Sequence, residues 1–203
     1  MVRYALMWIS RNYKADDWKA LNFKTEDDWQ KAIAIFRDRM ETRCLEHIRR
    51  ILGHRTSGFA AMALDCAVIE TMEQFRRGEP KTPYKEGKKH FVSFLTETSF
   101  SPDISKRKAG LFYKNIRCGL LHQTEAEDSL IKRNDTRPLI AFTEDHKGVI
   151  VNAKVFHQRL EQVIREYEAM LKDPESKKER AAFRTKMNFI CRIEGEPPEP
   201  QPA

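Results

Sequence analysis

The chain has 203 residues, of which 40% are hydrophobic and 33% are charged, and its formal net charge is +7. This length fits one domain with a tail and is enough to bury a core, while no apolar run approaches the roughly 18 residues of a membrane span. The excess of lysine and arginine makes a polyanion such as nucleic acid a plausible partner, because phosphates attract a basic surface and release counterions on binding. Charge alone does not identify that partner.

The cysteines are scattered, with no CxxC pair and no histidine at a zinc-like spacing. They are Cys44, Cys66, Cys118 and Cys191. We expect reduced thiols in a cytoplasmic protein, with no metal and no cofactor. The apolar start at residues 4–9 is too short for a signal-peptide core, and Asp16 follows soon after. No membrane partner is expected.

The first half of the chain predicts helices. Residues 1–24 show no clear period and are expected to form an N-terminal extension. Apolar side chains recur every three or four positions over residues 25–52, which predicts a long helix capped by Thr25 and ended by Gly53. A second helix over residues 57–77 keeps the same period and is rich in small side chains that would let another helix approach closely.

A Gly- and Pro-containing loop at residues 78–87 separates these helices from a short helix at 88–98. A further helix is expected to begin near Asp103 or Ser105, with its apolar side turned to the core.

The polar segment 125–137 is expected to be mobile, and residues 138–151 predict a β-hairpin around a Gly-containing turn. Asn152 is placed to cap a last long helix that runs to about residue 172. The expected parts of the chain are an extension at 1–24, a helical domain at 25–172, a basic helix at 173–194 and a disordered Pro-rich tail at 195–203. The predicted fold is mainly all-α, a bundle of four to five core helices with a small β-hairpin before the last long helix.

One short stretch carries chemistry. In "FYKNIRCGLLHQ", residues 112–123, Arg117 and His122 lie among apolar neighbours, where a cation needs a partner or a task. The spacing proves little by itself, since Arg49 and His54 repeat it. That second pair closes the first helix, where cations are favourable at a C-terminus. Context therefore singles out Arg117 and His122.

Arginine and histidine together suit the cleavage of a phosphodiester. The planar fork of Arg117 matches phosphate oxygens and can stabilise the charge that builds in the transition state. His122 titrates near neutrality, so it can take or give a proton. RNA brings its own nucleophile, the 2′-hydroxyl, so no metal is needed. The expected products carry a 2′,3′-cyclic phosphate and a 5′-hydroxyl.

One histidine cannot serve both the attacking and the leaving oxygen at once. A two-fold homodimer would bring a second Arg117 and His122 to the same cleft. Within a straight helix, residues five apart point about 140° away from each other, which also favours a site shared between two chains. Gly119 lies between the two residues, and we expect it to bend or end the helix and turn His122 back towards the cleft.

The stretch 112–123 resembles the signature of the HEPN superfamily, in which Arg is followed after four to six residues by His on a late helix of a helical bundle. The order of elements over residues 25–172 is similar as well. The resemblance implies a metal-independent endoribonuclease that works as a homodimer, of the kind found in toxin–antitoxin systems and anti-phage defence. An antitoxin or another regulatory protein is then a further expected partner. By position, Arg117 and His122 are the catalytic pair.

Two positions depart from patterns common in that family. The residue after the arginine is often polar, and here it is Cys118. Some toxins carry a tyrosine two residues after the histidine, and here that position is Thr124, so the chain is not assigned to that subset.

Other residues are candidates for supporting roles. Asn115 can hydrogen-bond phosphate or the histidine, with an exposed helix position as the alternative. Asp65 and Glu70 can orient a histidine or pair with Arg117, with surface ion pairs as the alternative. The expected RNA-binding residues are Lys114, Lys81, Lys85, Lys88, Lys89 and the loop aromatic Tyr84. A solvated basic face is the alternative for the lysines.

Three functions therefore remain open on the sequence. The chain is an endoribonuclease, a non-catalytic module that binds RNA, a nucleotide or a protein, or an enzyme of another class. No Gly-rich phosphate loop, HExxH motif or paired catalytic cysteine supports the third.

Overall fold

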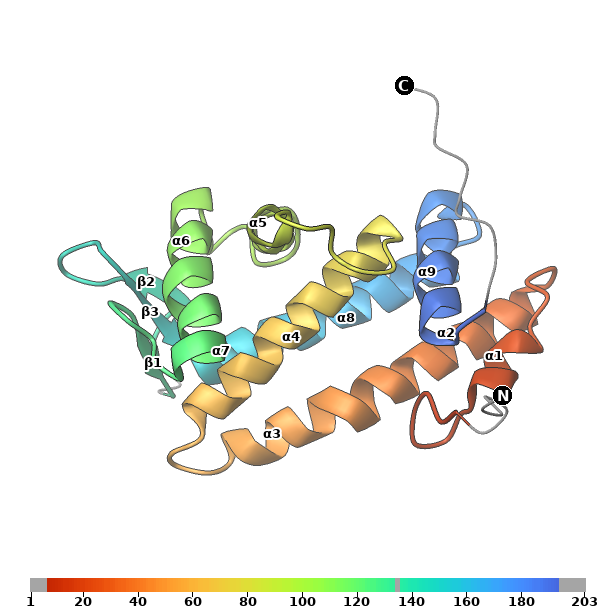
Figure 1. Cartoon of the computed structure of the whole chain (residues 1–203), viewed down its shortest axis with the longest axis horizontal. Helices are drawn as coiled ribbons and strands as arrows, with labels where there is room; N and C mark the ends of the chain where they lie inside the picture. The colour runs from red at the N-terminus through yellow and green to blue at the C-terminus, as the bar shows by residue number, and fades with distance from the viewer. Residues whose placement is uncertain (1–6, 134–135, 194–203) are drawn as a thin grey trace, which may run out of the picture. The chain divides into compact units, whose positions relative to one another are not determined.

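We describe residues 7–133 and 136–193 in a computed structural model of the chain. The protein is mainly helical, with a small three-stranded sheet before its last two helices (Figure 1). The helical elements are α1 (Ala15–Lys19), α2 (Glu26–Met40), the π-helix η2 (Glu41–Leu45), α3 (Glu46–Leu52), α4 (Gly58–Arg77), α5 (Gly87–Glu97), α6 (Lys106–Leu111), the π-helix η3 (Phe112–Cys118), α7 (Gly119–Gln123), α8 (Ala153–Lys172) and α9 (Lys177–Ile190). The strands are β1 (Leu130–Lys132), β2 (Ile140–Phe142) and β3 (Val149–Asn152). Within the described part of the chain, no helix has the length and apolar character needed to cross a membrane.

The chain divides into two compact units. The first unit is the described part of Met1–Arg43, Gln74–Lys81 and Glu168–Ala203, and the second unit is the described part of Cys44–Glu73 and Thr82–Tyr167. Helices α4 and α8 contribute residues to both units. The domain limits expected at residues 24 and 172 stay a prediction.

Polar side chains begin the helices where the sequence predicts them. Thr25 Oγ1 accepts a hydrogen bond from Asp28 N at 3.3 Å, and Ser105 Oγ accepts one from Lys108 N at 3.4 Å. Asn152 Oδ1 accepts from Val155 N at 3.5 Å at the start of α8. Each cap satisfies a backbone N–H that the helix itself leaves without a partner.

In the first unit, aromatic rings fill the core. Phe183 of α9 lies 5.7 Å from Phe36 of α2 and 5.8 Å from Phe75 of α4, measured between ring centroids. Trp18 packs edge-on against Phe183 at 5.5 Å. The predicted basic C-terminal helix is therefore an amphipathic element whose apolar side belongs to a core.

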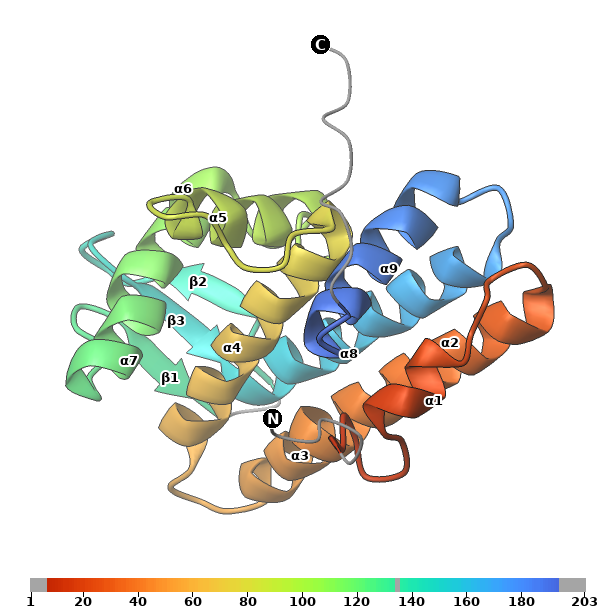
Figure 2. The same ribbon diagram turned by 45° about the vertical axis from the view of Figure 1, so that its right-hand side comes forward.

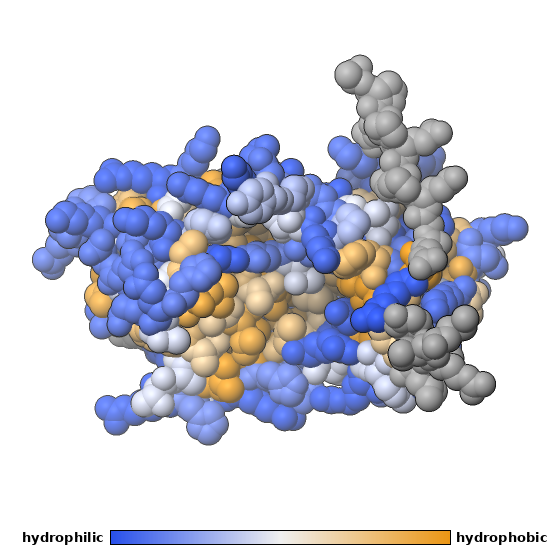
Figure 3. All heavy atoms as spheres, in the orientation of Figure 1, coloured by the Kyte–Doolittle hydropathy of each residue, from blue (hydrophilic) through white to orange (hydrophobic). Residues whose placement is uncertain are grey.

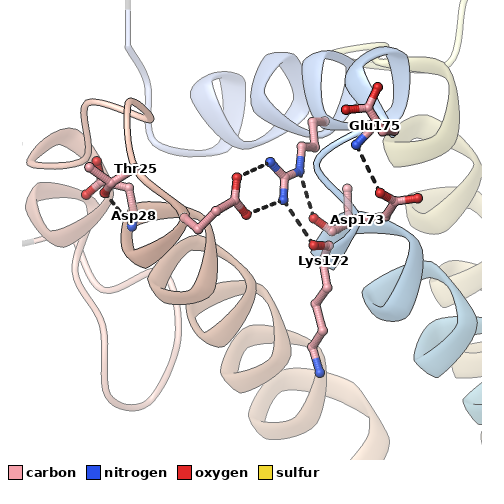
Figure 4. Close-up of polar contacts among 8 residues, drawn as sticks. Thr25, Asp28, Lys172, Asp173 and Glu175 are labelled. Carbon is pink, nitrogen blue, oxygen red and sulfur yellow. Dashed lines mark hydrogen bonds and ion pairs between the residues drawn. The ribbon is translucent and has the colours of Figure 1, made fainter.

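A buried arginine fixes the start of α9 in the same unit. Arg180 donates two hydrogen bonds to the carboxylate of Glu26, at 2.8 and 2.7 Å, and one to the carbonyl of Leu171 at 2.9 Å. Its guanidinium also lies 4.4 Å from the ring centroid of Trp29. Figure 4 shows the hydrogen bonds of this network, including a further one from Arg180 to the Lys172 carbonyl, together with the Thr25 cap.

The second unit has its own aromatic core, shared by α5, α8 and the helical run of α6, η3 and α7, which carries Arg117 and His122 and is called the motif helix below. Phe112 stacks on Phe156 at 5.0 Å and lies 5.7 Å from Phe91, and Phe100 lies 4.7 Å from Phe156. All four side chains are fully buried. This core holds one side of the motif helix and leaves its other side for different contacts.

The expected hairpin is present as part of a larger sheet. Strands β2 and β3 pair antiparallel, with Ile140 opposite Val151. Strand β1 adds to the other edge of β3 in parallel, with Leu130 opposite Ile150, so the strand order is β1-β3-β2. Strand β1 lies within residues 125–137, the segment expected to be mobile, and the sequence did not predict a strand there. The three strands lie beside the α6–η3–α7 helix in both ribbon views (Figures 1 and 2).

Candidate functional site

Arg117 is held on the last turn of η3 by two neighbours. Its Nε donates a hydrogen bond to Glu70 Oε1 of α4 at 2.5 Å, and its guanidinium lies 5.5 Å from the ring centroid of Tyr113, one turn earlier. The Arg117 side chain is 19% exposed and that of Glu70 is 30% exposed, so the pair lies at the protein surface. Burial alone would lower the pKa of Arg117, but the hydrogen bond and charge of Glu70 raise that pKa above its ordinary value. Arg117 is therefore a fixed cation.

The helix around Arg117 is a π-helix from Phe112 to Cys118. The sequence predicts an ordinary α-helix here. π-Helical turns are rare and occur frequently at functional sites, since the extra residue in the turn re-aims side chains. The segment brings Tyr113, Arg117 and Cys118 together. Burial, followed by the neighbouring Cys118, raises the pKa of the Tyr113 hydroxyl against the opposing charge of Arg117.

His122 lies on α7, exposed, near the end of the same helical run. Among residues 7–133 and 136–193 it has no hydrogen-bond or ion-pair partner, so neither kind of bond joins it to Arg117. The run ends at Thr124, which adopts a left-handed conformation with φ 54°. The two residues are thus carried by one helical run, without a hydrogen bond or ion pair between them.

Gly119 does not bend or end the helix, so that prediction is wrong. It has ordinary helical dihedrals, φ −58° and ψ −49°, and helix α7 continues through Gln123. A side chain is excluded for another reason. The chain folds back after Thr124, and a Cβ at Gly119 would lie 2.4 Å from the carbonyl oxygen of Glu125. Glu125 N donates to Gly119 O at 3.3 Å in this turn.

Asn115 is fully buried, so neither reading from the sequence describes its place. Its side-chain nitrogen donates to Ser129 Oγ at 3.3 Å and to the carbonyl of Lys147 at 3.2 Å. Ser129 Oγ in turn accepts from Val149 N at 3.0 Å. Asn115 therefore fastens the motif helix to the sheet, and the sheet sets the orientation of that helix.

The two predicted carboxylates have separate partners. Glu70 pairs with Arg117. Asp65 is fully buried and lies 2.8 Å from Nδ1 of His157, whose Nε2 lies 3.5 Å from Glu161 Oε1. Burial raises the pKa of Asp65 against the opposing effect of His157. The structure thus gives Asp65 a histidine partner, but this is His157 of α8 and not His122.

The predicted RNA-binding lysines do not form one group. Lys85, Lys88 and Lys89 line a pocket that extends along α5, together with Lys106 of α6. Lys81 belongs to the first unit, where its Nζ lies 5.8 Å from the ring centroid of Phe189. Lys114 is exposed on η3, outside the pocket lining. Tyr84, 89% exposed, lies beside Lys85, whose Nζ is 5.3 Å from the ring centroid.

An apolar surface adjoins Arg117. Leu121 of α7 is 47% exposed and lies one turn after Arg117, on the same side of the helix. On α4, Leu64 is 39% exposed and Ala67 is exposed, and they continue the row that ends at Glu70. Figure 3 shows apolar atoms gathered over the first half of α4, next to α7. Because Arg117 contacts Glu70, both rows face the same side of the second unit.

Sequence reasoning missed Tyr113, His157 and Lys106. Tyr113 had a signal, because an aromatic side chain four residues before an arginine on a helix can contact its guanidinium. His157 also had one, as a polar residue beside Phe156 in the apolar stripe of α8. Lys106 had none, because only the packing of α6 on α5 brings it to the pocket.

No group of three or more potential metal ligands occurs among the residues that the structure describes. The four cysteines are free thiols, with Cys66 and Cys191 buried. Burial raises the pKa of Cys66 well above its ordinary value and that of Cys191 to about 12, so neither is a reactive thiolate near neutral pH. Comparison with known proteins found no matching family model, no matching curated protein and no matching solved structure.

Proposed function

We propose that the chain is a metal-independent endoribonuclease of the HEPN type, whose active site forms where two copies of the second unit meet. The observation that carries the proposal is the arrangement of Arg117 and His122. One helical run presents a fixed cation and an exposed imidazole without a hydrogen-bond or ion-pair partner among the described residues, and the two lie five residues apart on it. A second copy would complete the site.

The apolar surface beside Arg117 supports the homodimer. Leu64, Ala67 and Leu121 are exposed next to the motif, and small side chains on α4 permit close approach of another helix. Burying such side chains removes apolar surface from water, which favours association by about 25 cal/mol per Å². A two-fold axis through this surface would place two Arg117 and two His122 side chains around one cleft.

The reaction follows from the chemistry of these groups. His122 of one copy takes the proton from the 2′-hydroxyl, whose oxygen forms a new bond to phosphorus. The bond from phosphorus to the 5′-oxygen breaks, and the second copy of His122 gives that oxygen a proton. Arg117 binds the phosphate oxygens and stabilises their charge in the transition state. Glu70 and Tyr113 position Arg117 without entering the reaction.

The test is cleavage of a labelled RNA pool in excess EDTA, with analysis of the product ends. We expect products that end in a 2′,3′-cyclic phosphate. The cleavage rate should fall by about 10²- to 10⁴-fold in His122→Ala and by about 10²- to 10³-fold in Arg117→Ala. His54→Ala is the matched control, because His54 is also exposed and also lies five residues after an arginine.

Equal activity in His122→Ala and the wild type would overturn the proposal. RNA binding without cleavage by the wild type would instead favour the non-catalytic module. A role in toxin–antitoxin regulation or anti-phage defence, in the cytoplasm and under control of an antitoxin or another regulatory protein, belongs to the same proposal.

A further inference from the structure

A basic pocket lies between α5 and α6, away from the Arg117–Glu70 pair but in the same unit. Its volume is about 540 Å³, and its lining includes four lysines. The lining residues are Lys85, Lys88, Lys89, Val92, Ser93, Thr96, Glu97 and Lys106. Helices α5 and α6 lie side by side in both ribbon views (Figures 1 and 2).

The charge of this pocket favours an anion. Glu97 is the carboxylate in the lining, and Lys89 is paired with Glu86 beside it at 2.9 Å, so the four ammonium groups still outnumber the carboxylates at the pocket. The Thr96 hydroxyl in the same wall donates to the carbonyl of Val92 at 2.9 Å, so the ammonium groups are the donors that phosphate oxygens would accept from. Like charges gathered around a concave surface raise the local concentration of a polyanion.

Tyr84 and Lys85 give the pocket an aromatic edge. Tyr84 is 89% exposed, and Lys85 Nζ lies over its ring. Lys85 itself has a left-handed conformation with φ 69°, immediately before Glu86, the cap of α5. An exposed aromatic ring beside lysines is the combination with which proteins bind single-stranded nucleic acid, because bases stack on the ring while the cations follow the backbone.

Tyr113 connects this pocket to the candidate active site. Its ring lies 5.5 Å from the guanidinium of Arg117 on one side. On the other side, its hydroxyl lies beside Gly87, the first residue of α5. A Cβ added at Gly87 would lie 3.3 Å from the oxygen of that hydroxyl. The first turn of α5, with Lys88 and Lys89, is therefore separated from Arg117 by the span of one tyrosine side chain.

We infer that the α5–α6 pocket binds the sugar–phosphate backbone of single-stranded RNA next to the phosphate that Arg117 engages, with a base stacked on Tyr84. This inference rests on the proposed function for its ligand and deepens it, since it assigns single-stranded RNA as the substrate class. A duplex keeps its bases stacked on each other and offers no free base to Tyr84. The pocket therefore selects against duplex RNA.

The test measures binding separately from cleavage. In a His122→Ala background, the probe is a fluorescein-labelled 12-nucleotide oligouridylate, followed by fluorescence anisotropy from 50 to 300 mM NaCl. Lys85→Ala with Lys106→Ala is expected to weaken binding by about tenfold. The slope of log K against log salt should fall by about 1.4, because each lysine that neutralises a phosphate of a single strand contributes about 0.7 to it. Lys132→Ala, an exposed lysine of β1 in the same unit, is the matched control and is expected to change neither quantity.

Tyr84 tests the stacking step. Tyr84→Ala is expected to weaken binding about fivefold with no change in the salt slope, and Tyr84→Phe to restore it, because the ring rather than the hydroxyl stacks. All variants change exposed side chains, so thermal melting within about 1 °C of the parent is expected and is measured for each.

Several results would overturn the inference. The first is that the parent does not bind the oligouridylate, and the second is that the double lysine variant binds it with unchanged affinity. The third is tighter binding of a 12-base-pair RNA duplex than of the oligouridylate. The fourth is that ATP displaces the probe at concentrations far below the concentration of inorganic phosphate needed for the same displacement. The last would identify a nucleotide pocket. Because binding is read in the His122→Ala background, a failed nuclease proposal would leave an oligouridylate site at these lysines intact, and the two failures are distinguishable.

Discussion

The two units treat their cations in opposite ways. In the first unit, Arg180 is 6% exposed and Lys186 is 5% exposed, and each is enclosed by oxygen acceptors. Lys186 Nζ donates to Gln74 Oε1 at 2.6 Å and to the carbonyl of Pro80 at 2.7 Å. Such groups are committed to the fold, because most of their N–H donors are already bound to acceptors of the same chain and their side chains are closed off from solvent.

In the second unit, the cations of interest stay at the surface. Arg117 has one carboxylate partner, and Lys85 and Lys106 lie around an open pocket. His122 has no partner in the described part of the chain. The difference shows that the positive charges of a basic protein have different roles. Some of them stabilise helix packing, and others remain available to bind a polyanion.

The largest effect expected from this comparison is on stability in the first unit. Arg180→Ala removes hydrogen bonds to Glu26, Leu171 and Lys172 and the interaction with Trp29. We expect the free energy of unfolding to fall by about 2–3 kcal/mol, since bonds to charged groups are removed and buried carbonyls are left without their donor. Urea denaturation followed by circular dichroism measures this.

Lys178→Ala is the control, because Lys178 is exposed on the same helix and should change stability by less than about 0.5 kcal/mol. At a temperature where Arg180→Ala is folded, its cleavage rate is expected to equal that of the wild type. Two results would contradict the distinction between structural cations in the first unit and available cations in the second. One is an Arg180→Ala variant with the stability of the wild type, and the other is a folded Arg180→Ala variant that no longer cleaves RNA.

A pair of glycine substitutions sharpens the comparison within the motif helix. In Gly119→Ala, the new Cβ would lie 2.4 Å from the Glu125 carbonyl oxygen, so the turn after His122 must shift. We expect a loss of about 1–3 kcal/mol in stability from this overpacking. Gly110→Ala, in the same helical run, meets nothing within 4 Å and is expected to gain about 0.5–1 kcal/mol, because alanine has less freedom to lose on folding.

Thermal melting of the two variants side by side measures the difference. Equal melting temperatures would show that the chain does not fold back closely over Gly119, and that α7 ends in a different way.

The sequence predicted the helices well because their signals are local. Thr25, Ser105 and Asn152 cap helices as expected, and the apolar periods of α2, α4 and α8 follow from side chains three and four residues apart. These depend only on neighbours along the chain. The Arg117–His122 pair was found in the same way, from its apolar surroundings.

What the sequence did not predict depends on contacts between distant segments. Strand β1 has three residues and forms only by pairing with β3, about twenty residues later. Asn115 is buried because the sheet lies against its helix, and Lys106 reaches the pocket because α6 packs on α5. Gly119 was read as a helix breaker because glycine often is one, whereas close backbone approach is the actual reason.

A smaller effect is expected at Glu70, the residue that orients Arg117. Glu70→Gln keeps the size and a hydrogen-bond acceptor but removes the charge, so the guanidinium is held less tightly. We expect cleavage to fall about tenfold, or about 1.4 kcal/mol in the activation free energy, with stability changed by less than about 1 kcal/mol since the pair is partly exposed. The loss should appear in kcat rather than KM.

Glu166→Gln, on α8, is the control for this variant. If Glu70→Gln loses stability but cleaves RNA as fast as the wild type, the Arg117–Glu70 pair stabilises the fold and has no part in the reaction.

The finest test concerns Lys186. Burial, together with the charges of Arg39 and Lys81, lowers its pKa to about 8 from its ordinary 10.5. Between those values the unfolded chain binds a proton that the folded chain does not, so stability rises with pH through this window.

Cys191 acts in the opposite sense above about pH 9, since its pKa in the folded chain is raised to about 12. From pH 8 to 9, Lys186 should therefore add about 1 kcal/mol to the unfolding free energy, close to the limit of 1.36 kcal/mol for one proton, while the raised pKa values of the buried Cys66 and Cys191 thiols offset part of this rise. Lys186→Met has no proton to lose and should flatten this rise, whereas Lys178→Met on the exposed side of α9 should keep it. If the unfolding free energy of Lys186→Met rises as steeply with pH as that of the wild type, Lys186 is not an enclosed cation. The cations of the first unit would then be as exposed to solvent as those of the second.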